Sequence, residues 1–333
     1  MEQALPVRGS DPIAFRFTGS GGEYFRIWIT NLLLTILTVG IYSAWAKVRR
    51  NRYFYRNTRL ADAAFDYHAT PRTILRGRLL AALAFLVYSV TTHMHPASTG
   101  VFVLLFFLIL PWLVVRAMTF RARNTSYRNI RFDFARNYRG AIGVYAGMPL
   151  LLIPTLGLVY PELVRRQKAF VVANSRFGTT PFAFHARSGA FYRIFALAAL
   201  LVVLLVVAGF LLGMTYRPLG YAVGAGLYLV LIAYMSASLG NLVYNSTTLG
   251  PHALHSRLEE RKLFWIYLTN TLVIIATLGL YLPWAHVRLA HYRAASLELL
   301  PGGDLGAFVG QSMEKVASTG EEMSELFDVD IGI

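Results

Sequence analysis

Long apolar segments alternate with shorter basic segments along this chain. Seven apolar stretches stand out, at about residues 25–45, 79–93, 100–118, 140–161, 190–212, 218–240 and 263–285. A helix needs about 20 residues to cross the hydrocarbon of a bilayer, and most of these stretches are long enough. The pattern predicts an all-α polytopic membrane protein.

The loops between the apolar stretches differ in charge. Loop 93–100 contains no Lys or Arg, and loop 213–220 contains only Arg217. The four longer loops hold nine, six, five and three Lys or Arg, in 46–78, 119–139, 162–189 and 241–262. Because cytoplasmic loops are enriched in Lys and Arg, we expect these basic loops and the C-terminus to be cytoplasmic.

A second motif recurs in the basic loops. Each copy begins with Asn followed by Ser or Thr, and an apolar residue stands eight residues later, which opens an aromatic-x-aromatic pair in three of the four copies; the copies start at Asn57, Asn124, Asn174 and Asn245. Period-two alternation around a Gly-, Asp- or Asn-containing turn predicts a short β-hairpin. We expect four such hairpins, lying at the membrane surface with their aromatics toward the interface.

The spacing of these motifs indicates internal tandem repeats. Asn57 and Asn174 are 117 residues apart, and Asn124 and Asn245 are 121 apart. Self-similarity at a fixed period is a strong sign of repeated architecture. We divide the chain into an N-terminal tail, repeat 1, repeat 2, a third junction segment and an acidic C-terminal tail, at 1–14, 15–139, 140–258, 259–300 and 301–333.

Three apolar stretches, 25–45, 140–161 and 263–285, lead into basic sequence and are termed junctions. If each junction crosses the membrane, each repeat has three spans, and the repeats are inverted. If each junction dips into the membrane and returns, the repeats are parallel, and all four basic loops share one side. The charge bias favours the dipping, re-entrant arrangement, although 25–45 is long enough to cross.

Small polar residues and helix breakers recur in the junctions. Irregular backbone at membrane depth is tolerated only where it is buried in protein or lines a wet cavity. Converging junctions predict a central polar vestibule, formed by Asn31, Thr35, Thr38, Gly40, Thr155, Gly157, Asn270, Thr277 and Gly279. The alternative is that these residues only hold helices together by hydrogen bonds.

The charge balance changes the list of possible partners. The chain is 56% hydrophobic and 15% charged, with a formal net charge of +15. The cations lie in loops, as membrane topology requires, and no nucleic-acid-binding signature is present, so we expect membrane lipids, especially anionic ones, and no nucleic acid. Candidate anion-binding residues are Lys47, Arg49, Arg50, Arg52, Arg165, Arg166 and Lys168. The sequence does not indicate an oligomeric state.

Catalytic and metal signals are weak. The chain has no cysteine, which excludes disulfides and thiolate metal sites. His93 and His95 form an i, i+2 pair on a short loop, where a metal would be held weakly at best. No nucleophile elbow or phosphate loop occurs. We expect neither an enzyme nor a cofactor or metal site.

Three stretches carry a resemblance to a known family. They are FRFTGSGGEYFRIWITNLLLTILTVGIYSAWAKVRRNRYFYRNT (15–58), YLTNTLVIIATLGLYLPWAHVRLAHYR (267–293) and FDVDIGI (327–333). The chain resembles the YjgN-like family of bacterial inner-membrane proteins, a domain of unknown function. The resemblance implies an inner-membrane location and no assigned reaction. The middle junction departs from it, with Glu162 where Trp45 and Trp284 stand and Met148 where Asn31 and Asn270 stand.

The tail 301–333 is acidic, with seven Asp or Glu against one Lys. Its apolar residues recur at helical spacing, which predicts an amphipathic helix docked on the basic hairpins; a solvated, disordered tail is the alternative.

Taken together, the sequence predicts a channel- or transporter-like membrane protein. The alternative is a non-transporting scaffold that binds anionic lipid or a membrane partner through its basic hairpins.

Overall fold

A computed structural model describes residues 11–314, and within them four helices are long and apolar enough to cross a membrane. They form two helical hairpins, α3 (Pro71–Met94) with α4 (Thr99–Arg123), and α8 (Ser188–Thr215) with α9 (Arg217–Asn245). A 3-10 turn, η1 (Pro96–Ser98), joins the first pair. Because α3 begins at Pro71, it is longer than the apolar stretch 79–93 and reaches the length that a span needs.

The prediction of an all-α fold is wrong. Ten short strands close into one antiparallel barrel, in the order β1-β10-β9-β8-β7-β6-β5-β4-β3-β2. The strands are β1 (Ile13–Phe17), β2 (Thr58–Leu60), β3 (Ala63–Tyr67), β4 (Thr125–Tyr127), β5 (Ile130–Phe134), β6 (Ser175–Phe177), β7 (Thr180–Phe184), β8 (Thr247–Leu249), β9 (His252–Ser256) and β10 (Leu297–Leu300).

Closure explains why the hairpins are not separate surface features. The four expected hairpins are present as β2–β3, β4–β5, β6–β7 and β8–β9. An isolated hairpin leaves a row of unpaired N–H and C=O groups on each edge. Here each hairpin pairs with the next, and β1 pairs with both β2 and β10, so no edge stays open.

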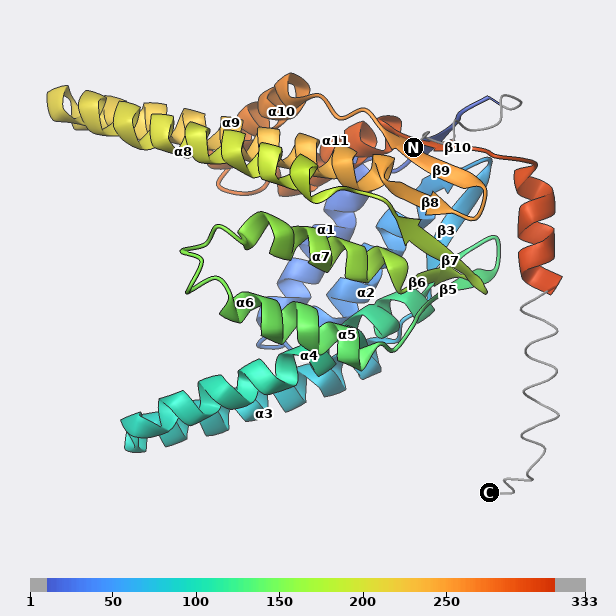
Figure 1. Cartoon of the computed structure of the whole chain (residues 1–333), viewed down its shortest axis with the longest axis horizontal. Coiled ribbons are helices and arrows are strands. Elements are labelled where there is room, and N and C mark those ends of the chain that lie inside the picture. The colour runs from blue at the N-terminus through green and yellow to red at the C-terminus, as the bar shows by residue number, and fades with distance from the viewer. Residues whose placement is uncertain (1–10, 315–333) are drawn as a thin grey trace.

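Helical hairpins connect the other strand pairs that follow one another in the chain, β1–β2, β3–β4, β5–β6, β7–β8 and β9–β10. The two apolar pairs occupy two of these places, and the three junctions occupy the others. The junction elements are α1 (Gly21–Leu37) and α2 (Ser43–Arg56); α5 (Tyr138–Ile142), η2 (Gly143–Gly147), α6 (Met148–Leu150) and α7 (Tyr160–Ala173); and α10 (Glu260–Ala276) and α11 (Leu282–Ala295). The helical hairpins extend from one end of the barrel, with the α6–α7 loop between the splayed apolar pairs (Figure 1).

Apolar side chains of alternate strand positions line the inside of the barrel, and we call this interior the lumen. Phe15, Phe65, Phe132 and Phe182 form a ladder around it, with neighbouring ring centroids 6.2, 6.4 and 6.5 Å apart. Leu254 of β9 also packs against this core. This period-two pattern is what a closed barrel requires, since inward and outward positions alternate along every strand.

A short helical segment, 305–314, covers the end of the barrel opposite the helical hairpins (Figure 1). Leu305, Phe308 and Val309 pack on the lumen core, and Val309 is only 5% exposed. The Asp304 carboxylate accepts hydrogen bonds from the N–H groups of Gly306 and Ala307 and so caps the segment. The segment therefore packs on lumen-facing residues of the hairpins through apolar contacts. The rest of the acidic tail lies outside the described residues.

Candidate functional site

The junction tips share one backbone turn. Val39 with Gly40, Leu156 with Gly157, and Leu278 with Gly279 all have positive φ. In each tip the glycine N–H donates to a carbonyl five residues earlier, at 2.8 Å. Glycine adopts this left-handed conformation without the steric cost that a Cβ brings. The other residue of each pair is more than nine-tenths exposed, so the tips present apolar side chains outward.

The predicted vestibule residues lie at the tips and on the helices of the junctions. The hydroxyls of Thr35, Thr38, Thr155 and Thr277 donate to carbonyls of their own segments, four residues earlier. Gly40, Gly157 and Gly279 lie in the tips. None of the nine candidates lines either of the two cavities described below.

Asn31 and Asn270 occupy matching places on α1 and α10 and are both buried. The Asn270 Oδ1 accepts a hydrogen bond of 3.1 Å from Arg288, whose guanidinium also donates to Thr269. The Asn31 Oδ1 has no hydrogen-bond partner among the described residues. A buried acceptor without a partner is uncommon, and water is one group that satisfies such atoms.

The predicted anion-binding residues lie on α2 and α7, between the tips and the barrel. Arg49 donates to the Tyr42 hydroxyl at 3.0 Å. Arg165 and Arg166 are both engaged by Glu162, at 2.6 and 2.9 Å. The hydrogen bonds from Arg165, followed by those from Arg166, lower the pKa of the Glu162 carboxyl to about 2. The remaining four cations, Lys47, Arg50, Arg52 and Lys168, are exposed.

The asparagine motif has a structural role at three of its four sites. Asn57, Asn124 and Asn174 each end a helix, and their side-chain amides donate to the carbonyl four residues earlier. The fourth copy is shifted by one residue, because Ser246 is the C-cap of α9. Asn245 instead bonds the backbone of Ser256 in β9.

A cavity of about 560 Å³, the basal chamber, lies where helices α2, α4, α9 and α11 meet strands of the barrel. Two cations line it, Arg121 at the end of α4 and Arg293 at the end of α11. Both side chains are exposed, and neither forms an ion pair with any residue between 11 and 314. Tyr55 of α2 lines the same chamber. The sequence pattern had marked Arg121 only as one of the loop cations and had given Arg293 no role.

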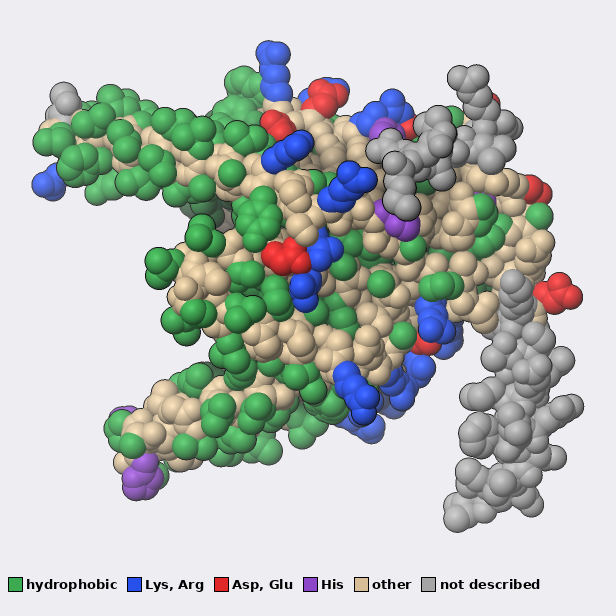
Figure 2. All heavy atoms as spheres, in the orientation of Figure 1, with side chains coloured by type: hydrophobic (Ala, Val, Ile, Leu, Met, Phe, Trp, Pro, Cys, Tyr) green, Lys and Arg blue, Asp and Glu red, His purple; other side chains and the backbone are tan. Residues whose placement is uncertain are grey.

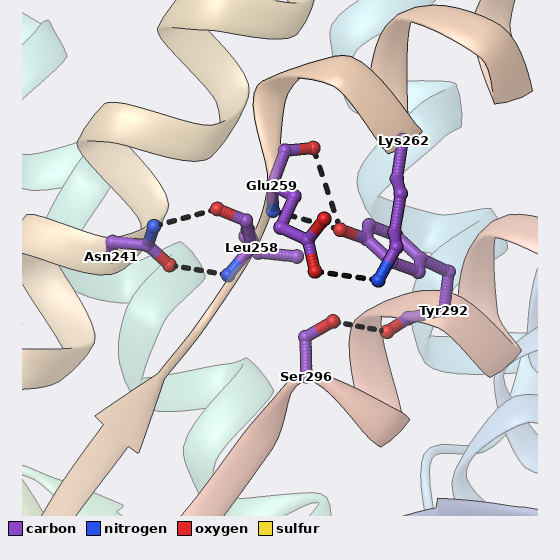
Figure 3. A network of polar contacts seen from close by, with 6 residues as sticks. All are labelled: Asn241, Leu258, Glu259, Lys262, Tyr292 and Ser296. Atoms are coloured by element: carbon purple, nitrogen blue, oxygen red, sulfur yellow. Dashed lines mark hydrogen bonds and ion pairs between the residues drawn. The ribbon is translucent and has the colours of Figure 1, made fainter.

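A polar network fixes one wall of the basal chamber (Figure 3). Asn241 of α9 bonds both the N–H and the C=O of Leu258, at 2.8 and 2.9 Å. The Tyr292 hydroxyl of α11 accepts from the Glu259 N–H at 2.8 Å. The linker between β9 and α10 is thereby tied to α9 and α11, the helices that carry Tyr244 and Arg293.

A second cavity, of about 240 Å³, lies in the lumen and has apolar walls. It shares Phe15, Phe65, Tyr244 and Leu297 with the basal chamber, so the two cavities adjoin. Tyr244 is 41% exposed although it lies between them.

His252 stands at the end of the lumen that segment 305–314 covers, with its ring edge-on to Phe308 at 4.6 Å. Its Nδ1 accepts from the Gly302 N–H, whereas its Nε2 has no hydrogen-bond partner in the described residues. Burial lowers the pKa of its imidazole, which favours the neutral ring. No group of three or more His, Asp or Glu suited to a metal occurs in residues 11–314.

Apolar helices protrude from one end of the molecule, and Lys and Arg lie around their roots and over the barrel (Figure 2). This distribution, with four helices of spanning length, defines a multi-pass membrane protein. The chain belongs to the family described as bacterial protein of unknown function (DUF898), whose model matches residues 12–326.

Two curated relatives extend this assignment. The chain is 27% identical over 360 residues to "Inner membrane protein YjgN" of Salmonella typhimurium, which covers 90% of this chain and 91% of the relative. It is 30% identical over 148 residues to the protein of the same name from Escherichia coli K12, covering 44% of this chain and 37% of that protein. No solved structure matches the chain. The resemblance to the YjgN-like family is thus confirmed.

Proposed function

We propose that this protein is a multi-pass inner-membrane protein that binds an anionic amphiphile of the membrane in its basal chamber. Two helical pairs span the bilayer, and the three junctions dip into it and return. The barrel, the basic loops and the C-terminus lie in the cytoplasm. The protein acts by binding rather than by catalysing a reaction.

The arrangement of strands supports the dipping junctions. Strands from both repeats belong to one closed barrel, which cannot straddle a bilayer that its own helical hairpins enter. The tips of the junctions expose Val39, Leu156 and Leu278, as expected for groups that contact lipid rather than water. The positive-inside bias then places the barrel in the cytoplasm.

Labelling of single cysteines tests this topology, because the natural chain has no cysteine. Arg59→Cys and Arg176→Cys are on exposed barrel positions, and His95→Cys and Arg217→Cys are on the short loops. We expect an impermeant maleimide to label only the loop variants in spheroplasts and all four after permeabilisation. Labelling of Arg176→Cys but not Arg59→Cys in intact spheroplasts contradicts the dipping arrangement.

One observation carries the binding proposal: Arg121 and Arg293 line the same chamber without a carboxylate partner in the described chain. Hydrogen bonds to charged groups stabilise by about 1.5–3 kcal/mol, so an anionic head group that meets both guanidiniums would be held firmly. The aromatic and apolar walls around them fit the hydrocarbon part of an amphiphile.

Native mass spectrometry of the detergent-purified protein tests this binding. Phosphatidylglycerol and phosphatidylcholine serve as anionic and zwitterionic probes. We expect the double variant Arg121→Gln/Arg293→Gln to bind phosphatidylglycerol at least about tenfold more weakly. The control Arg131→Gln/Arg176→Gln removes the same charge from exposed strand positions outside the lumen and should bind normally. An equal loss in both variants would show that only surface charge attracts the lipid.

A transporter- or channel-like function is the second candidate, and the unpartnered Asn31 Oδ1 favours it. Three helix-breaking tips entering the bilayer are the kind of structure that forms sites in transporters. The proposal of simple binding predicts no ion current when the purified protein is inserted in a planar bilayer. Discrete current steps that an Asn31→Leu variant lacks would support the channel instead.

A further inference from the structure

The lumen has the properties of a binding site rather than of a finished core. Its cavity of about 240 Å³ exceeds the roughly 150 Å³ of an engineered apolar cavity that stays dry and binds benzene. Protein interiors normally leave few voids larger than a water molecule. An apolar group of substantial size can therefore occupy it.

The two ends of the lumen differ in what they adjoin within the described residues. At one end, segment 305–314 covers the lumen, with Phe308 stacked on Phe177 at 6.3 Å and Val309 buried. At the other end, the lumen shares four wall residues with the basal chamber. A ligand that enters from the side of the helical hairpins thus passes Arg121 and Arg293 before it reaches the lumen.

The two cavities differ in a way that selects the orientation of a ligand. No Lys or Arg lines the lumen, and burial favours the neutral form of the His252 ring in its wall, so burying an unpaired charge there would be very costly. The basal chamber offers two guanidiniums that form no ion pair within residues 11–314. A molecule with one anionic end and one hydrocarbon end therefore fits with its head in the chamber and its chain in the lumen.

We infer that the lumen is a hydrocarbon-chain site, which takes the acyl chain of an anionic membrane amphiphile whose head is held by Arg121 and Arg293. This inference rests on the proposed function, since the same arginines hold the head. It adds that chain length, and not only head-group charge, determines affinity.

The test uses lysophosphatidylglycerols of increasing chain length and the full-length protein in detergent. Each methylene group that enters the lumen should raise affinity by about fourfold, until the cavity is full and the affinity levels off. Leu254→Phe places a fifth phenylalanine in the ladder of Phe15, Phe65, Phe132 and Phe182, so it fills the lumen with a side chain that equivalent strand positions already accommodate. Phe182→Leu makes the opposite change.

In the Leu254→Phe variant we expect the affinity to level off at shorter chains, and the longest chain to bind about tenfold more weakly. In the Phe182→Leu variant we expect the affinity to level off at longer chains. The control Leu278→Phe makes the same substitution at a junction tip that is 95% exposed and should leave the series unchanged. The inference would be overturned if the affinity depended on chain length in the same way in all three variants and in the natural protein.

The arginine variants separate this failure from failure of the proposed function. Arg121→Gln/Arg293→Gln should lower the affinity for every lysophosphatidylglycerol by one common factor, and the affinity should still level off at the same chain length. If this common factor is seen while the lumen variants change nothing, the head-group site stands and the chain site is wrong. If no lysophosphatidylglycerol binds more tightly than lysophosphatidylcholine, the proposed function itself is wrong.

Discussion

The first and third junctions differ from the middle one below an identical tip. All three tips combine a left-handed residue pair with the same 2.8 Å hydrogen bond to the glycine N–H. In the outer two, a tyrosine stacks on a tryptophan just after the tip, at 6.0 Å for Tyr42–Trp45 and 5.9 Å for Tyr281–Trp284. The middle junction has Glu162 at that place, held by Arg165 and Arg166.

The incoming helices differ as well. α1 and α10 are regular helices of 17 residues, whereas the middle junction enters through α5, a π-helical turn and the short α6. Pro149 and Pro154 lack the N–H that a continuous helix needs. The three tips therefore share the Thr-x-Gly sequence and the turn, whereas the side chains that pack next to the turn differ between the junctions.

The largest expected effect separates the two tryptophans. Trp284 packs on Phe25 at 4.8 Å and fills the space above Gly21, where an added Cβ would lie only 2.2 Å from the indole. Trp45 has one ring contact in the described chain, with Tyr42. We expect Trp284→Ala to lower the free energy of unfolding by about 3 kcal/mol and Trp45→Ala by about 1 kcal/mol. Thermal unfolding in one detergent measures both, and equal losses would mean that the two outer junctions are packed alike.

A smaller effect concerns the ion pairs of the middle junction. The pKa of Glu162 is about 2, below its ordinary value of 4.5, so the folded state favours the charged carboxylate. Its stabilisation is present above about pH 4.5 and is lost as the pH falls toward 2. We expect Glu162→Gln to cost about 2 kcal/mol at pH 7 and much less at pH 3. Unfolding midpoints at the two pH values test this. A loss of the same size at pH 3 would assign the effect to shape rather than charge.

The smallest effect compares the paired asparagines. Asn270→Leu removes the acceptor of Arg288 and should cost about 1 kcal/mol. Asn31→Leu removes an oxygen that has no partner in the described structure, so stability should stay equal or rise slightly. The same unfolding assay measures both. A clear loss with Asn31→Leu would indicate that bound water or a ligand pairs with Asn31, as the transporter-like candidate requires.

Local patterns predicted the parts of the fold that depend on near neighbours. Apolar length identified the four helices of spanning length, and alternation after the asparagines located the hairpins. The closed barrel was missed, because it depends on IAFRF at β1 pairing with LELL at β10, about 280 residues later in the chain. Neither strand is joined to a neighbouring strand by a tight turn, and a local sequence pattern does not identify a strand that pairs from far along the chain.

The candidate site was missed for a similar reason. Arg121 was counted with the other loop cations and Arg293 was given no role, although each lies three residues before a helix C-cap, Asn124 or Ser296. That shared position was the available signal, because both helices lead directly into barrel strands, so residues at the same distance from the C-cap lie at the same end of the barrel. No local sequence pattern predicted the cavity in the lumen, because a cavity depends on the summed volumes of side chains from many strands.

The pairing of β1 with β10 has a consequence for biosynthesis. A ribosome makes β1 among the first residues and β10 near residue 300, so the sheet keeps two open edges until almost the whole polypeptide has been synthesised. Open strand edges invite pairing with other chains. Early membrane insertion of α3 and α4 would meanwhile tether the nascent strands, which lowers their chance of meeting another copy. Premature termination before Leu297 should therefore yield a species that quality-control proteases remove.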